Sequence, residues 1–220
     1  YSAGVSGTLI TGSAIHYGYY MPFGLLTPAS WVALFTRRYM HLTGCTQDAL
    51  FEIAQATRDY AVRNPAAFFY QRPMTRADYD AGKKICNPLT LYDCCQESDG
   101  GCAIVVTTPE RARHLKQPGV SIRGVAQCIA KDQEEMTSFY RPDIARIPEM
   151  DLAADEAYAQ CGLSAQDIDA AVIYDAFTPI VLWQLESYGF CKRGESAAFV
   201  RDGNLELGGR LPCNTHGGQL

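Results

Sequence analysis

The sequence predicts an α/β fold in which parallel-rich mixed sheets are flanked by helices. Three observations lead to this prediction. Residues 171–173 form a short apolar run without polar alternation, which is typical of a strand buried on both faces of a parallel sheet. A helix with a proline at its start follows this run. From residue 120 onward, strand and helix patterns alternate, which favours a parallel layer with crossover helices.

Start and stop residues delimit the predicted helices. Thr27, followed by Pro28, begins a helix that runs to Gly44, and Thr46 begins a second helix that ends before Asn64. Apolar residues recur at helical spacing in both segments. Further helices are expected at residues 76–85, 109–115, 148–161 and 178–188.

Strands are expected at 89–96, 102–107, 120–130 and 171–173, and residues 201–209 should form a Gly-rich hairpin or loop. The two helices that follow an aromatic, Gly-punctuated loop predict a helical subdomain over about residues 14–90. We expect a first domain over residues 1–118, which includes this subdomain, and a second over residues 119–220.

Polar and aromatic side chains stand at the end of the 171–173 strand. Thr178 is the expected N-cap of the next helix, with Pro179 at its first position, so Tyr174, Asp175 and Phe177 fall on the connection. Open α/β sheets bind their ligands at the carboxyl ends of their strands. This connection is the first candidate site. The alternative for this stretch alone is that Tyr174 is a half-buried aromatic residue that ends a strand.

The closing segment LPCNTHGGQL is a second candidate site. Gly217 and Gly218 would let the backbone turn close to a ligand and present an imidazole, that of His216, on a rigid loop next to Asn214. A plain turn is the alternative for this segment alone. The remaining histidines are given no catalytic role, because they lie in an aromatic loop or near helix ends: His16, His41 and His114.

Composition excludes several classes of function. The chain has 220 residues and a net charge of −5 without a basic block, which argues against a nucleic-acid or membrane surface. Its apolar stretches are interrupted too early to span a bilayer, and no signal peptide is visible, so a cytoplasmic location is expected. Nine cysteines are scattered without a C-x-x-C pair, which favours reduced thiols over a metal site. We expect no bound metal.

Several segments resemble the thiolase superfamily when they are taken in order. They are MPFGLLTPASWVALFTRRYMHLTG, PLTLYDCCQESDGGCAIVVTTPERAR, YDAFTPIVLWQLESYGFCKRGE and GGRLPCNTHGG. The resemblance is closest to the branch of lipid-transfer or thiolase-like proteins that includes bacterial steroid side-chain-cleaving aldolases. It implies a thiolase-like fold and a chain that is a fragment of a longer protein. The nucleophilic cysteine of true thiolases would then lie before Tyr1, and the last catalytic loop would follow Leu220.

The resemblance also implies a chemistry. Tyr174 stands where thiolases carry an asparagine or histidine, a departure shared with the aldolases. A retro-aldol cleavage of a β-hydroxyacyl-CoA, which releases a short acyl-CoA and a ketone, requires a base, donors to the thioester oxygen and an acid, but no covalent intermediate. We therefore expect an acyl-CoA lyase with Tyr174 and His216 as catalytic residues. To act as a base, Tyr174 would need a lowered pKa, with His216 one candidate cause.

Two alternatives remain open. The chain could belong to a CoA-dependent thiolase or acyltransferase that uses a cysteine outside it, or to a non-catalytic thiolase-like scaffold subunit. No covalently bound cofactor is expected, and coenzyme A enters as part of the substrate. The resemblance implies a homodimer paired through residues 102–107 and a small partner with an OB-fold domain of the DUF35 type. We expect Asp175 to be structural, and the substrate to contact Asn214, Gly217, Gly218, Phe177 and Met21.

Overall fold

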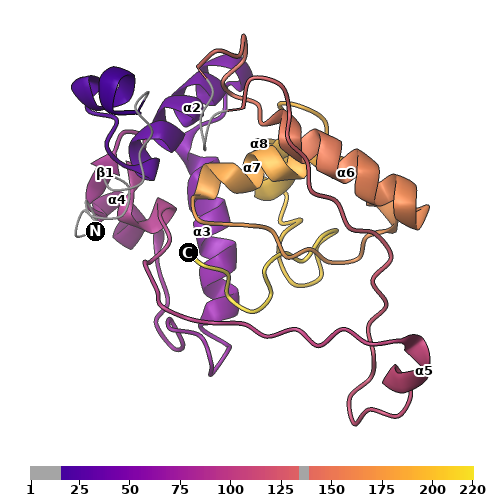
Figure 1. Cartoon of the computed structure of the whole chain (residues 1–220). Helices are drawn as coiled ribbons and strands as arrows, with labels where there is room; N and C mark the ends of the chain where they lie inside the picture. Colours follow the sequence, from indigo (N-terminus) through magenta and orange to yellow (C-terminus); the bar gives the residue numbers. More distant parts are fainter. Residues whose placement is uncertain (1–15, 134–138) are drawn as a thin grey trace.

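Helix α7 (Thr178–Ser187) is the centre around which four other helices pack. Its residues from Thr178 to Leu185 are all buried, as expected for a helix that is apolar nearly all round. The computed structural model describes residues 16–133 and 139–220, and α7 lies in the interior of the helical body (Figure 1). The helices that contact it are α2 (Pro28–Thr43), α3 (Gln47–Ala61), α6 (Pro148–Cys161) and α8 (Ser196–Arg201).

The predicted helices at residues 28–44, 46–61 and 148–161 are confirmed. Helix α2 begins at Pro28 and ends at Gly44, whose φ of 72° is left-handed and suits a residue without a side chain. Helix α3 begins directly after Thr46. Helix α6 ends at Gly162, which is also left-handed. The start and stop signals therefore located these elements to within a few residues.

The remaining elements are short. Helix α4 (Arg76–Ala81) ends earlier than predicted, because the chain turns into a two-stranded antiparallel sheet of β1 (Lys84–Cys86) and β2 (Leu89–Thr90). Helix α5 (Pro109–Ala112) is a single turn. The others are π- or 3-10 turns, namely η1 (His16–Tyr20), η2 (Met21–Phe23), η3 (Leu91–Asp93) and η4 (Ala165–Asp167).

The start of α7 differs from the prediction by one residue. Thr178 is the first helical residue, and Phe177 occupies the N-cap position without a side-chain cap. The Thr178 hydroxyl instead donates to Asp93 Oδ1 at 2.7 Å, a buried partner from a distant part of the chain. Helix α8 was not predicted at all.

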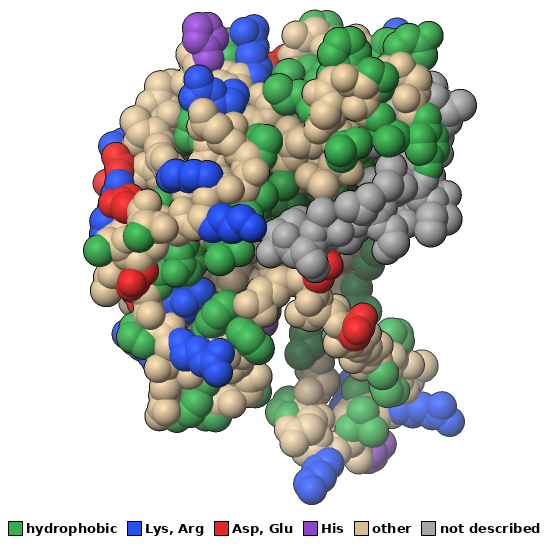
Figure 2. Space-filling view, turned by 90° about the vertical axis from the view of Figure 1, so that its left-hand side faces the viewer, with side chains coloured by type: hydrophobic (Ala, Val, Ile, Leu, Met, Phe, Trp, Pro, Cys, Tyr) green, Lys and Arg blue, Asp and Glu red, His purple; other side chains and the backbone are tan. Residues whose placement is uncertain are grey.

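The parallel-rich sheets are not found among the described residues, whose one sheet is β1–β2. Residues 102–107 and 120–130 are extended but form no strand, and they lead out from the body to α5 and back (Figure 1). Figure 2 shows a gap between the body and a projecting lobe. Val105 is 86% exposed. A strand needs a neighbouring strand for its backbone groups, and no described strand pairs with either run; the neighbour of residues 120–130 is helix α6.

The prediction that residues 171–173 form a strand buried on both faces is wrong. Val172 is 80% exposed, whereas Ile173 is buried. Only Ala171 pairs, in a single parallel bridge to Cys213. The segment is extended and one of its faces is covered by the core, so its side chains alternate between core and surface.

Three further observations concern the described residues as a whole. All nine cysteines are free thiols, as the sequence predicts. None of the described helices combines the length and the apolar character that a membrane crossing requires. Within the same residues, no group of three or more His, Cys, Asp or Glu side chains is arranged to hold a metal ion.

Candidate functional site

The loop at residues 211–220 lies against the connection that carries Tyr174. Ala171 N–H donates to Pro212 O at 3.0 Å, and Asn214 N–H donates to Ala171 O at 2.9 Å. Two segments about 40 positions apart therefore meet.

Two side-chain amides hold consecutive backbone units of this connection. Asn214 accepts from Ile173 N–H at 2.8 Å and donates from Nδ2 to Ile173 O at 2.9 Å. Gln184, on α7, accepts from Tyr174 N–H at 3.2 Å and donates from Nε2 to Tyr174 O at 2.6 Å. Each amide satisfies one donor and one acceptor, as a neighbouring strand would. The backbone of Tyr174 is thus fixed from both sides.

Asp175 joins the same two segments. Both of its carboxylate oxygens accept from Gln219 N–H at 3.0 Å, and the side chain is buried. Burial raises the pKa of Asp175, and the hydrogen bond from Gln219 partly offsets this rise. Gly218 lies directly against the carboxylate, because a Cβ built there would be 2.0 Å from Asp175 Oδ2. Asp175 therefore accepts its hydrogen bonds from the backbone of the loop.

The Tyr174 side chain points out of the core and is 54% exposed. Its pKa is raised, first by partial burial and then by the nearby Cys95 and Asp175. The lowered pKa that a base would need is therefore not found. The phenol is protonated near neutral pH, which suits a proton donor.

His216 lines a cavity of about 530 Å³. The cavity also receives Asn64, whose Nδ2 donates to His216 O at 2.8 Å. Tyr174 is not among its lining residues. The structure thus brings the two loops together without placing both side chains in this one cavity.

The other residues predicted to contact the substrate do not all line one cavity. Gly217 and Gly218 line the His216 cavity. Asn214 is buried, and its side-chain amide forms hydrogen bonds with the backbone of Ile173. Phe177 is a buried core residue in an antiparallel bridge with Cys94. Met21 begins η2, which lies well apart from the 211–220 loop (Figure 1).

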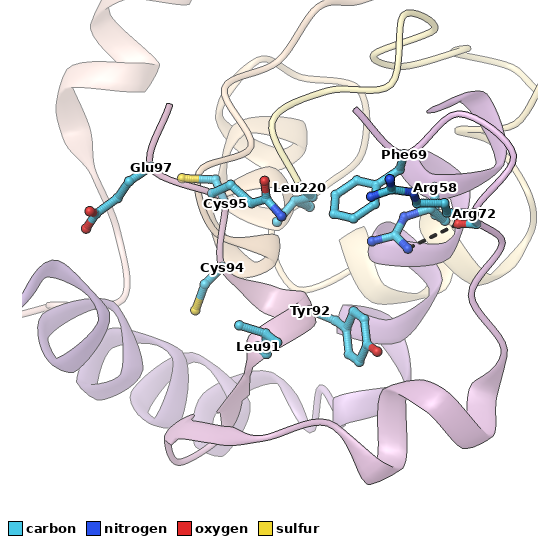
Figure 3. A pocket seen from close by; sticks show the side chains of 10 residues that line it. Arg58, Phe69, Arg72, Leu91, Tyr92, Cys94, Cys95, Glu97 and Leu220 are labelled. Carbon is cyan, nitrogen blue, oxygen red and sulfur yellow. Dashed lines mark hydrogen bonds between the residues drawn. The ribbon is translucent and has the colours of Figure 1, made fainter. Parts of the chain in front are cut away.

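A second cavity, of about 590 Å³, was not predicted from the sequence (Figure 3). Arg58, on α3, projects into it together with Arg72 and Phe69. Arginine on an amphipathic helix is usually read as part of the solvated face. A signal was nevertheless present, because Arg58 follows Ala54 by four positions and precedes Ala61 by three, so it lies on the apolar stripe.

Comparison with known proteins finds a family model for part of the chain and several similar proteins. Residues 130–220 match the family model described as thiolase C-terminal domain-like. A steroid side-chain-cleaving aldolase of Thermomonospora curvata is 56% identical over 93% of this chain and 52% of its own length. The 17-hydroxy-3-oxo-4-pregnene-20-carboxyl-CoA lyase of Mycobacterium tuberculosis is 51% identical over 90% of this chain and 52% of its own length.

A solved structure has the same architecture. The Ltp2-ChsH2(DUF35) aldolase superposes with a TM-score of 0.91 at 56% identity, over 94% of this chain and 54% of the solved one. The chain spans about half the length of the curated relatives that it matches. The chain is therefore similar to a thiolase C-terminal-like domain over residues 130–220 and to these aldolase and lyase relatives along most of its length.

Proposed function

We propose that the protein to which this chain belongs is an acyl-CoA lyase that cleaves a β-hydroxyacyl-CoA by a retro-aldol reaction. The observation that carries the proposal is the identity of 56% and 51% to two proteins named as an aldolase and a CoA lyase. Both names favour carbon–carbon cleavage over acyl transfer. The substrate class that we propose is the side chain of a steroid, carried as a CoA thioester.

The reaction needs two proton movements. A base removes the proton of the β-hydroxyl, the bond between the α and β carbons breaks, and its electron pair becomes an enolate of the thioester. A ketone leaves, and protonation of the α carbon yields the shortened acyl-CoA. No electron acceptor is required, because cleavage only redistributes electrons within the substrate.

We assign one group to each movement. The protonated phenol of Tyr174 is suited to donate the proton to the α carbon. His216, an imidazole on the rim of its cavity, is the proposed base for the hydroxyl. The amides of Gln184 and Asn214 fix the backbone on which Tyr174 stands, which limits the orientations available to the phenol.

The finer architecture and the assembly belong to the same proposal. We infer that the complete protein has parallel-rich sheets, with a domain boundary between residues 118 and 119 of this chain and a helical subdomain over about residues 14–90. We also propose a homodimer and a DUF35-type partner. The partner is supported by the name of the similar solved structure, the Ltp2-ChsH2(DUF35) aldolase.

The test is the Tyr174→Phe variant of the full-length protein, assayed for cleavage of a β-hydroxyacyl-CoA. The variant loses only the hydroxyl, so turnover should fall by on the order of 10²-fold or more with little change in unfolding free energy. Tyr140→Phe, which removes an exposed phenol hydroxyl elsewhere, is the matched control and should leave turnover unchanged. Near-normal turnover of Tyr174→Phe would mean that Tyr174 has no role in proton transfer. The transferase or scaffold alternatives would then be favoured.

A further inference from the structure

Arg58 is a buried cation without a carboxylate partner among the described residues. Its side chain is on α3, and the residue is 8% exposed. Nη1 donates to Arg72 O at 3.3 Å, and Nε has no hydrogen-bond partner within the described part of the chain. The guanidinium carbon lies 3.6 Å from the centre of the Phe69 ring. One ring and one carbonyl are the main compensation for a charge withdrawn from water.

A second cation is at the same end of the cavity. Figure 3 shows Arg58, Phe69 and Arg72 together at one end, whereas Glu97 is at the opposite end and points away from them. Arg72 forms no ion pair with any described residue. Two guanidinium groups without a neighbouring carboxylate produce a local positive potential, which favours a ligand with more than one negative charge.

The cavity continues toward the candidate site. Phe69, Gln96 and Leu220 line both this cavity and the one that His216 lines, so the two are adjoining. The cavity wall formed by Cys94 and Cys95 is bonded to the Tyr174 connection, because Cys95 N–H donates to Ala176 O at 2.8 Å. A long ligand can therefore reach from the two arginines to the reactive loops. The volume of about 590 Å³ is typical of a small-molecule site.

We propose that this cavity binds a phosphate group of the CoA portion of the substrate, with Arg58 and Arg72 as its cationic ligands. The inference rests on the proposed function, since it assumes a CoA thioester. A guanidinium offers a planar fork of N–H donors that matches phosphate oxygens, and the ring of Phe69 holds the Arg58 fork in place. Binding at this end leaves the acyl end of the thioester at the His216 cavity.

The first experiment compares two substrates with the same acyl group in the full-length protein. One is the CoA thioester, and the other is the N-acetylcysteamine thioester, which lacks every phosphate. Arg58→Met retains an unbranched apolar stem against Phe69 but removes the charge. It should raise KM for the CoA thioester about 10-fold or more and leave kcat and the KM of the truncated thioester nearly unchanged, because only the CoA thioester loses a charge-assisted hydrogen bond.

Two variants separate recognition from folding. Arg72 is exposed, so Arg72→Gln should fold normally and still raise KM selectively for the CoA thioester. Arg38→Gln removes an exposed arginine of α2 outside the cavity and should change neither KM. If Arg58→Met and Arg72→Gln weaken both thioesters equally, or weaken neither, the phosphate site is wrong.

A binding measurement keeps this test independent of catalysis. Calorimetric titration with CoA and with pantetheine, which lacks the phosphates, requires no cleavage. Wild-type protein should bind CoA more tightly, and Arg58→Met should lose that difference. If the protein shows this binding pattern but no cleavage, the phosphate site is supported and the lyase function is wrong. If the protein cleaves the thioester but binds CoA and pantetheine with equal affinity, the lyase function is supported and the phosphate site is wrong.

Discussion

Gly218 is the residue at which the loop of His216 comes closest to the Tyr174 connection. Its φ of 61° is left-handed, and a Cβ at this position would be 2.0 Å from Asp175 Oδ2 and 2.7 Å from Thr57 Cγ2. The absence of a side chain is therefore required by space as well as by backbone conformation. The sequence indicates that these glycines allow a close approach, but it does not show that a carboxylate is what they approach.

We predict that Gly218→Ala separates the two loops. The new methyl group must displace the Asp175 carboxylate, so the unfolding free energy should fall by about 2 kcal/mol or more. Urea denaturation measures this change. Gly208→Ala is the matched control, because Gly208 also has a positive φ, of 91°, but no atom within 4 Å of its Cβ position. Equal losses in the two variants would mean that backbone strain alone is responsible.

At the scale of elements, Asp93 ties three segments of the chain together. It is fully buried and accepts from the hydroxyl of Tyr79 on α4 at 2.8 Å, from Thr90 N–H at 2.7 Å and from the Thr178 hydroxyl at 2.7 Å. Burial raises the pKa of Asp93, and these hydrogen bonds oppose the rise. The carboxylate thereby anchors the first turn of α7, immediately after the connection that carries Tyr174.

We predict that Tyr79→Phe and Thr178→Val each lower the unfolding free energy by about 1 kcal/mol, because each removes one donor to a buried carboxylate. The two donors are on different elements, so a coupling energy measured with the double variant reports whether Asp93 links them. A value of about 0.5 kcal/mol or more is expected. Strict additivity would show that the two contacts act independently and that α7 is not held through Asp93.

The same network explains where sequence reasoning succeeded and where it failed. The starts of α2 and α6 are set by local residues such as Pro28 and Pro148, so they could be predicted. The start of α7 was misplaced by one residue, because the hydroxyl of Thr178 is used by Asp93, 85 positions away. Gln184 and Arg58 were not singled out, and Asn214 was expected to contact substrate although it bonds to the backbone of Ile173, for a similar reason: these contacts join distant parts of the chain.

At the scale of the whole molecule, two predicted strands lack the partner strand that a sheet requires among the described residues. The runs at residues 102–107 and 120–130 have the composition of strands, yet Val105 and Val120 are exposed and neither run joins a sheet. Gln160 of α6 does hold one residue of the second run, since it accepts from Val125 N–H at 3.0 Å and donates to Val125 O at 2.9 Å. β-propensity favours an extended backbone, but it does not specify which edge that backbone joins.

The last prediction concerns the edge at residues 102–107. Ile104, Val105 and Val106 are exposed, and within the described chain the backbone of this run makes no hydrogen bond, which leaves an open apolar edge that favours pairing with another strand. We predict that the full-length protein is a homodimer in which this run pairs with the same run of a second copy. Because the two-fold axis would bring the same side chain of both copies close together, Val105→Lys should place two positive charges near each other and shift the dimer toward monomer.

Sedimentation velocity at micromolar concentration measures this shift. Leu207→Lys, which alters an exposed leucine after α8, is the control and should leave the dimer intact. Dissociation by both variants would point to a general effect of added charge and not to the edge. A wild-type protein that sediments as a stable monomer would exclude the pairing altogether. The apolar face of residues 104–106 would then have to be covered within one copy, by a segment of the same chain or by a different partner.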